Sequence, residues 1–243
     1  MNHPMYSEAF PLLPPDSFYS KVQYFHFPWP YLVVDDFLPN HLLTQLNDLE
    51  IDPVSADSFR VHKNYLSKTG KLNLTVIPPK LALSIHAACF PTLISCLSFL
   101  NPAKVSLYDY TELHLVQTGS SFQFPIHHDL RAKLLSVVVY LAPLNSSGTH
   151  LYSQRHKQSL ARVIDWKVNR SLIFSRIENT TWHSYRGSDS GERTALVYNL
   201  MTERPLQAAK LEGNSVPSIL ANDFSRYFSA KLSPLAKCIH RII

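Results

Sequence analysis

The spacing of apolar residues predicts two helices within the first hundred residues. Four leucines recur at helical spacing between residues 42 and 49, and they follow Asn40, a residue type that often caps helix N-termini. A longer apolar stretch over residues 81–100 predicts a second helix, with Pro91 as a point of interruption. A β-favouring run over residues 31–34, bounded by prolines, predicts a strand before both helices.

From residue 105 onward, short β-favouring runs replace the helical spacing. The strand candidates cover residues 105–117, 122–129, 134–141, 149–152, 171–174 and 194–200. Four of the six glycines fall in the gaps between these runs, where glycine favours turns. Many short strands at close spacing predict a mainly β (α+β) domain with flanking helices, arranged as a barrel or jelly roll.

The 243 residues fit one large domain with two appendages. A proline-rich, irregular lead-in is expected over residues 1–24, and the domain itself over residues 25–205. Residues 51–80 are expected to form loops and short strands. A helical tail is expected over residues 206–243.

Composition and charge exclude several classes of protein. Hydrophobic residues make up 45% of the chain and charged residues 17%, which argues against disorder. The net charge is +5, but the basic residues are scattered rather than gathered in a run, so a nucleic-acid partner is not expected. A basic pocket for an anionic small molecule would fit the same charge.

The cysteines and the apolar segments indicate a cytoplasmic protein. Cys89, Cys96 and Cys238 are odd in number and form no CxxC motif, which favours a reducing compartment. No basic start followed by an apolar stretch marks a signal peptide. His86 and Pro91 interrupt the stretch at residues 81–100, so a membrane span is not expected there.

The strongest chemical signal is the sequence Ile126-His127-His128-Asp129. In a strand, His127 and Asp129 would share one face while His128 points away. An imidazole and a carboxylate on one face are two ligands of a facial metal site, and His183 is the best candidate for the third. Two histidines and one carboxylate are typical of non-haem Fe(II), with positions left open for reactants. Zinc prefers tetrahedral sites, and no sulfur ligand is at hand.

Other residues compete for these roles. His150 and His156 are rival third ligands. Arg193 stands at the head of an apolar strand, where an inward-facing guanidinium requires an anion, and its planar fork suits a carboxylate. The alternative is that Arg193 pairs with Glu192 or Asp189 at the surface.

Several segments together resemble the 2-oxoglutarate/Fe(II)-dependent dioxygenase superfamily, in its prolyl-4-hydroxylase-like branch. The resemblance covers roughly residues 25–202 and is specific in the order of its parts. The matching parts are the "hydrophobic-DDFL" phrase at residues 28–39, the HxD segment at 125–129 with the core strand at 133–141, the glycine segment at 148–152, and Trp182-His183-Ser184 followed by Arg193.

The resemblance implies a double-stranded β-helix, a jelly-roll or cupin-like fold, with supporting helices on one side. It also implies Fe(II) and 2-oxoglutarate as cofactor and co-substrate, with O2 as oxidant and ascorbate as a candidate reductant. The implied metal ligands are His127, Asp129 and His183, and the implied co-substrate contacts are Arg193, Tyr140 and Gln117, with Tyr108 as a weaker candidate. Tyr140 could equally be a core aromatic residue.

The implied reaction is hydroxylation of a prolyl, amino-acid or small-molecule substrate, with release of succinate and CO2. The Asp129 carboxylate favours hydroxylation, since halogenating relatives lack it. The sequence departs from the family at Ser147, where a second glycine is usual, and at Ala195, where many relatives have Ser or Thr.

Two other functions stay open on the sequence. The first is a non-catalytic cupin-like module that binds a metal or ligand and does not need Arg193. The second is a nucleic-acid oxidative demethylase on the same scaffold. Whether the substrate is a peptide or a small molecule, and the oligomeric state, do not follow from the sequence.

Overall fold

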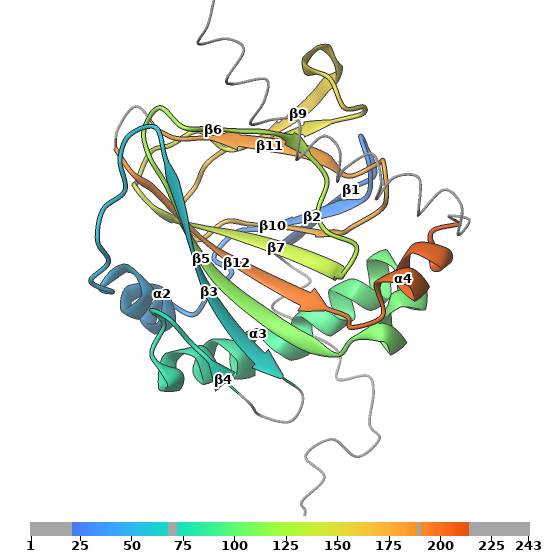
Figure 1. Cartoon of the computed structure of the whole chain (residues 1–243), viewed down its shortest axis with the longest axis horizontal. Helices are drawn as coiled ribbons and strands as arrows, with labels where there is room; N and C mark the ends of the chain where they lie inside the picture. The colour runs from blue at the N-terminus through green and yellow to red at the C-terminus, as the bar shows by residue number, and fades with distance from the viewer. Residues whose placement is uncertain (1–20, 68–71, 189–190, 214–243) are drawn as a thin grey trace, which may run out of the picture.

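The computed structural model describes residues 21–67, 72–188 and 191–213. It consists of two antiparallel sheets with helices on the outer face of the larger one (Figure 1). In the larger sheet the strand order is β1-β2-β10-β7-β12-β5-β3-β4, and in the smaller it is β6-β11-β8-β9. The two sheets face each other and enclose the cavity described below (Figure 1).

The larger sheet contains eight strands: β1 (Val22–Phe25), β2 (Tyr31–Val34), β3 (Phe59–Ser67), β4 (Leu72–Asn73), β5 (Tyr110–Thr118), β7 (Lys133–Ala142), β10 (Ser171–Ser175) and β12 (Arg193–Met201). The smaller contains β6 (Gln123–His127), β8 (Thr149–Tyr152), β9 (Leu160–Ile164) and β11 (Trp182–Arg186). The helices are α2 (Asn40–Asn47), α3 (Pro79–Leu100) and α4 (Pro205–Leu211), with 3-10 turns η1 (Pro102–Leu107) and η2 (Lys157–Ser159).

The central strands of the larger sheet separate a dry core from the cavity by simple alternation. In β7, Val137 and Val139 join the core beneath α3, while Ser136 and Val138 line the cavity. The other central strands, β5 and β12, alternate in the same way. Because successive strand residues point to opposite faces, one apolar sheet supplies both a helix-packing surface and a wall for the site.

A second buried cluster lies between the two sheets and supports the site from behind. Its members come from strands of both sheets and the segment before β2: Trp29, Tyr31, Val33, Tyr140, Leu151, Ile164, Leu172 and Phe174. The Phe174 ring packs edge-on against the His183 ring at 5.2 Å between centroids. A candidate metal ligand therefore rests directly on this aromatic packing.

Helix α3 is the one helix in the described part of the chain that is long and apolar enough to cross a membrane. Its inner face is buried in the core, with Ile85, Leu93 and Leu97 fully covered. Core helices pass the same length and composition test, so α3 gives no evidence of a membrane span.

Most of the predicted elements are confirmed, within a few residues at their ends. The predictions for β2, β7, β8, β10, β12 and both helices hold, and α3 continues through Pro91. One predicted strand is wrong at its start, because residues 102–107 form the 3-10 turn η1 and β5 begins only at Tyr110. Asn40 is the first residue of α2 and makes no side-chain cap.

The predicted boundaries also change. Strand β3 is nine residues long in a region expected to hold loops and short strands. The irregular lead-in was expected to run to residue 24, but β1 begins at Val22. Helix α4 begins the predicted helical tail, while residues 1–20 and 214–243 lie outside the described residues. Cys89 and Cys96 are buried free thiols, and Cys238 lies outside the described residues.

Candidate metal centre

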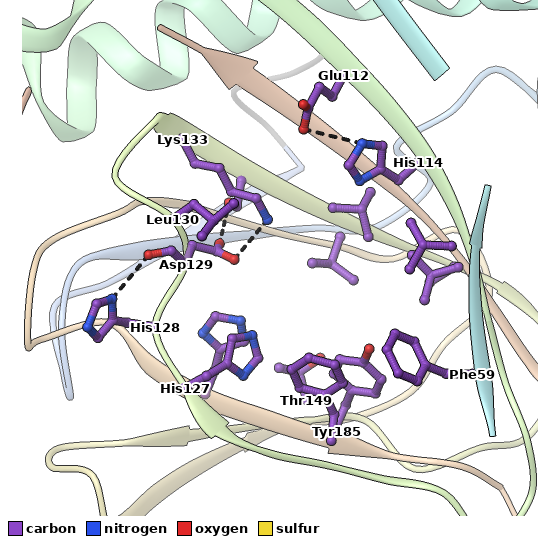
Figure 2. A pocket seen from close by; sticks show the side chains of 18 of the residues that line it. Phe59, Glu112, His114, His127, His128, Asp129, Leu130, Lys133, Thr149 and Tyr185 are labelled. Atoms are coloured by element: carbon purple, nitrogen blue, oxygen red, sulfur yellow. Dashed lines mark hydrogen bonds and ion pairs between the residues drawn. The ribbon is translucent and has the colours of Figure 1, made fainter. Parts of the chain in front are cut away.

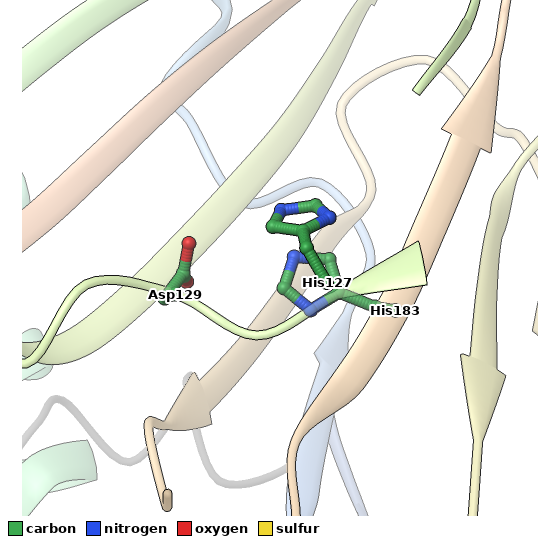
Figure 3. A group of neighbouring side chains, drawn as sticks. All are labelled: His127, Asp129 and His183. Carbon is green, nitrogen blue, oxygen red and sulfur yellow. The ribbon is translucent and has the colours of Figure 1, made fainter. Parts of the chain in front are cut away.

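Three potential metal ligands converge at one end of the smaller sheet (Figure 3). His127 is the last residue of β6, and His183 lies opposite it on β11 in the antiparallel register. Asp129 follows in the loop after β6 rather than within the strand. The ligand atoms of the three side chains lie within 4.8 Å of one another. Neither His150 nor His156 joins them in the described part of the chain.

Backbone carbonyls hold both imidazoles in the orientation that a metal ligand requires. Nδ1 of His127 lies 2.9 Å from the Pro125 carbonyl oxygen, and Nδ1 of His183 lies 3.0 Å from that of Thr181. A carbonyl can only accept, so each Nδ1 carries the proton and donates it. The Nε2 lone pairs are therefore left to bind a metal, an arrangement common among metal-ligating histidines.

Burial keeps both histidines neutral. It lowers the pKa of His127 to about 3 and also lowers the pKa of His183. Neutral imidazole is the form that ligates metals, so no proton has to leave either ring near neutral pH. Burial raises the pKa of Asp129, but the Lys133 ammonium and the two imidazoles beside it lower the pKa well below its usual range. Asp129 is therefore a carboxylate.

Two side chains of β7 fix the orientation of that carboxylate. Lys133 Nζ donates to Oδ1 of Asp129 at 2.8 Å, and Ser136 Oγ donates to Oδ2 at 2.5 Å (Figure 2). A carboxylate has about four lone-pair sites, so both oxygens keep capacity for a metal. Two neutral imidazoles and one carboxylate are the donor set of non-haem Fe(II) sites that keep positions open for reactants.

Arg193 lies in the same cavity and has unsatisfied donors. It is 1% exposed, and its Nε and Nη2 have no hydrogen-bond partner within the described residues. The guanidinium lies against the rings of Tyr185, Trp166 and Tyr140, at 4.8, 4.9 and 5.6 Å from their centroids. Burial lowers the pKa of Arg193, and such a buried cation requires an anion.

The alternative pairing of Arg193 with its neighbour is not present. Glu192 instead accepts hydrogen bonds from the backbone N–H of Val54 at 2.8 Å and from Gln117 Nε2 at 2.7 Å. The other proposed neighbour, Asp189, lies outside the described residues. The guanidinium thus faces the cavity rather than the surface.

The cavity has a volume of about 410 Å³, within the range of small-molecule sites. The candidate ligands and Arg193 line it, and His127, Thr149 and Tyr185 lie together on one side (Figure 2). Side chains of β3, β5 and β7 add a charged wall to the lining: Lys63, Glu112, His114 and Lys133. In this wall, His114 Nε2 lies 3.2 Å from a carboxylate oxygen of Glu112.

Of the remaining predicted contacts, Tyr140 lies beside Arg193 and Gln117 does not reach the site. The Tyr140 hydroxyl donates to Thr149 Oγ1 at 2.8 Å and accepts from the Thr149 backbone N–H at 3.1 Å. Gln117 belongs to the face of β5 opposite the cavity and bonds to His62 and Glu192. Strand alternation explains this, since its neighbour Val116 lines the cavity. The weaker candidate Tyr108 is a core residue.

Sequence reasoning missed several residues of the site. Tyr185 lies two residues after His183 on β11 and lines the cavity with it, a relation that follows only once residues 182–186 are known to form a strand. Thr149 pairs with Tyr185 across the strands. Lys133 and Ser136 reach Asp129 only because the chain turns back between β6 and β7. No local pattern marks them.

Comparisons with known proteins give structural matches only. No family model and no curated protein matches the chain. An oxidoreductase of the 2OG-Fe(II) oxygenase family from Burkholderia pseudomallei is 14% identical, with a TM-score of 0.51, covering 70% of this chain and 84% of that one. A Pseudomonas putida prolyl-4-hydroxylase is also 14% identical, with a TM-score of 0.44, covering 71% and 92% of the two chains.

A third match is a prolyl hydroxylase from Trichoplax adhaerens, solved with a peptide fragment of the hypoxia-inducible factor oxygen degradation domain. It is 14% identical, with a TM-score of 0.45, and covers 72% of this chain and 84% of that one. At 14% identity the Burkholderia structure demonstrates a shared fold. The chain therefore has the jelly-roll, double-stranded β-helix fold of the 2OG-Fe(II) oxygenases, and its relationship to them is one of structure.

Proposed function

We propose that the protein is a 2-oxoglutarate- and Fe(II)-dependent dioxygenase that hydroxylates a prolyl, amino-acid or other small substrate. The observation that carries the proposal is the placement of Arg193, whose buried and unpaired donors face the same cavity as the His127, Asp129 and His183 cluster. A metal site alone does not account for that arginine.

The chemistry of 2-oxoglutarate matches both features at once. One end of the molecule is a 2-oxo acid, which chelates metals, and the other is a carboxylate, which suits the planar fork of a guanidinium. Bound iron would couple the conversion of 2-oxoglutarate and O2 to succinate and CO2 with hydroxylation of the substrate. The fold shared with a 2OG-Fe(II) oxygenase family structure is consistent with this assignment.

The protein's own residues would bind, orient and desolvate the reactants. His127, Asp129 and His183 would hold the metal on one side and leave its other positions open. Arg193 would anchor the far carboxylate. The rings of Tyr185 and Trp166 exclude water around that ion pair, which strengthens it.

The charged wall favours a polar primary substrate. Glu112 and His114 form a half-buried pair, and burial lowers the pKa of His114 to about 4, so its ring is neutral near neutral pH. Lys63 and Lys133 lie in the same wall. These groups offer hydrogen bonds to an amino-acid residue or a polar small molecule, whereas a purely apolar substrate would leave them unpaired.

The test is calorimetric titration of 2-oxoglutarate into the Mn(II)-loaded full chain. In Arg193→Met we expect the 2-oxoglutarate Kd to rise at least tenfold, because the carboxylate loses a charge-assisted bidentate pair. Arg186→Met is the matched control, since Arg186 is exposed on β11 and does not line the cavity. Its Kd should stay within twofold of wild type.

The alternative is a cupin-like binding module. Such a module would bind Mn(II) through the three ligands but would show no 2-oxoglutarate binding, and Arg193→Met would behave like Arg186→Met. That pair of results would refute the dioxygenase proposal and favour the module.

A further inference from the structure

A buried network of ion pairs joins α4 to the core beside the candidate metal centre. Glu212, the residue directly after α4, accepts hydrogen bonds from Lys104 Nζ at 2.6 Å and Arg176 Nη1 at 2.8 Å. It also accepts from the backbone N–H of Glu178 at 2.8 Å. The side chains of Lys104, Arg176, Glu178 and Glu212 are each at most 2% exposed.

The same network contacts Asp129 and two residues close to it in the chain, His128 and Arg131. Arg176 Nε donates to the Asp129 carbonyl oxygen at 3.2 Å. Glu178, which pairs with Arg176, also accepts from Arg131 Nε at 2.8 Å, and His128 Nε2 lies 3.6 Å from its carboxylate. The network thus contacts His128, Asp129 and Arg131, while the intervening Leu130 is exposed.

Asp129 depends on such contacts because it lies outside the sheet. His127 and His183 are held by strand pairing in β6 and β11, but Asp129 follows the end of β6. Its side chain is fixed by β7, while its backbone carbonyl is held by Arg176. The position of the Asp129 carboxylate relative to the two imidazoles therefore depends on the ion-pair network as well as on β7.

Glu212 is the central anion of this ion-pair network. Arg176 and Lys104 are buried cations whose burial requires compensating anions, and Glu212 bonds to both. Burial raises the pKa of Glu178, but hydrogen bonds from Arg131 and Arg176 lower it to about 2, so Glu178 is ionised. Neutralising Glu212 would leave Arg176 to rearrange around Glu178, close to the Asp129 backbone.

We infer that Glu212 is a positioning residue for Asp129, so that the docking of α4 through Arg176 and Glu178 sets the metal affinity of the site. The inference rests on the proposed function in one respect, namely that the three-ligand cluster binds a metal. Partners that orient ligands without touching the metal commonly change affinity by about 10- to 100-fold when altered. The same range is expected here.

The test is titration of the full chain with Mn(II) alone, followed by the electron paramagnetic resonance signal of the free ion. In Glu212→Gln we expect the Mn(II) Kd to rise at least tenfold. Asp109→Asn is the control, because Asp109 holds the opposite end of α4 through Arg204 at 3.0 Å and through the backbone N–H of Glu203 at 2.8 Å. This control should bind Mn(II) within twofold of wild type.

A second variant covers the case in which Glu212→Gln does not fold. Arg131→Met removes the ion pair between Arg131 and Glu178, close to Asp129, and leaves the contacts of α4 in place. This variant too should weaken Mn(II) binding. Wild-type affinity in a folded Glu212→Gln, or in Arg131→Met, would overturn the inference, as would equal weakening in Asp109→Asn. If the wild-type chain itself binds no Mn(II), the proposed function fails, and this inference with it.

Discussion

At the scale of single residues, the two candidate metal histidines are oriented by the same kind of hydrogen bond. Each donates its Nδ1 proton to the carbonyl two residues earlier in the chain, at Pro125 and Thr181. The local backbone therefore selects the tautomer before any metal arrives. Burial then keeps the rings neutral, with the pKa of His127 lowered to about 3.

The lowered pKa values predict a loss of stability in mild acid for the metal-free protein. An unfolded histidine takes up a proton near pH 6.5, whereas folded His127 does so only near pH 3. This contribution to stability is complete above pH 6.5 and is lost as the pH falls from there toward 3. In His127→Asn we expect the drop in unfolding free energy between pH 6 and 5 to shrink by about 1 kcal/mol.

Urea unfolding at pH 7, 6 and 5 in the presence of a chelator measures this effect. His156→Asn serves as the control, because His156 is exposed on the connection between β8 and β9 and should leave the pH profile unchanged. An unchanged profile in His127→Asn would contradict the account of burial as the cause of the shift.

The residue types at the site were predictable to different degrees. His127, Asp129, His183 and Arg193 stand in a recognisable order, and the structure brings all four to one cavity. Gln117 was misjudged because its face of β5 depends on the register of the whole strand. Asp129 reaches the site from the loop after β6 and not, as the strand pattern predicted, by alternation within the strand.

At the scale of elements, the backbone of the "DDFL" segment, residues 35–38, is held by hydrogen bonds to Asn169, which is distant in sequence. Asn169 accepts from the Leu38 backbone N–H at 2.8 Å and donates to the Leu38 carbonyl at 2.9 Å, from a left-handed backbone position with φ 63°. Its own carbonyl accepts from the Phe37 N–H at 3.0 Å. These bonds connect the turn between β2 and α2 to the turn between β9 and β10.

Asn169→Ala should therefore destabilise the fold by about 2 to 3 kcal/mol, because two buried backbone groups of Leu38 lose their partner. Asn179→Ala is the matched control: Asn179 also has a positive φ, 54°, but is exposed. It should cost about 1 kcal/mol, from the strained backbone alone. Chemical unfolding of both variants measures the difference, and equal losses would refute the role given to the Asn169 side chain.

The strands that the sequence predicted best are long and apolar along most of their length. Strands β7 and β12 are long and rich in apolar residues, so their patterns are unambiguous. Strand β11 was missed because its five residues, Trp182–Arg186, show no regular alternation of apolar and polar types. The region before β5 was misread because apolar residues in a 3-10 turn can look like the start of a strand.

At the scale of the whole molecule, the site is made by layers that no local pattern describes. The larger sheet packs on α2 and α3 with one face and lines the cavity with the other, while the smaller sheet closes the cavity from above (Figure 1). Lys63, Glu112 and Lys133 meet across three strands that are far apart in the sequence. Only strand pairing brings these charges together, which is why the sequence did not predict the charged wall.

The layers of the fold bring the candidate metal ligands and a buried arginine to one cavity. The most direct test is the anaerobic addition of Fe(II) and then 2-oxoglutarate to the purified full chain, observed by visible absorption. We predict a charge-transfer band of the iron chelate in the wild type, no band in His183→Ala, and a band that requires at least tenfold more 2-oxoglutarate in Arg193→Met. A wild-type protein that shows no band under these conditions would contradict the account.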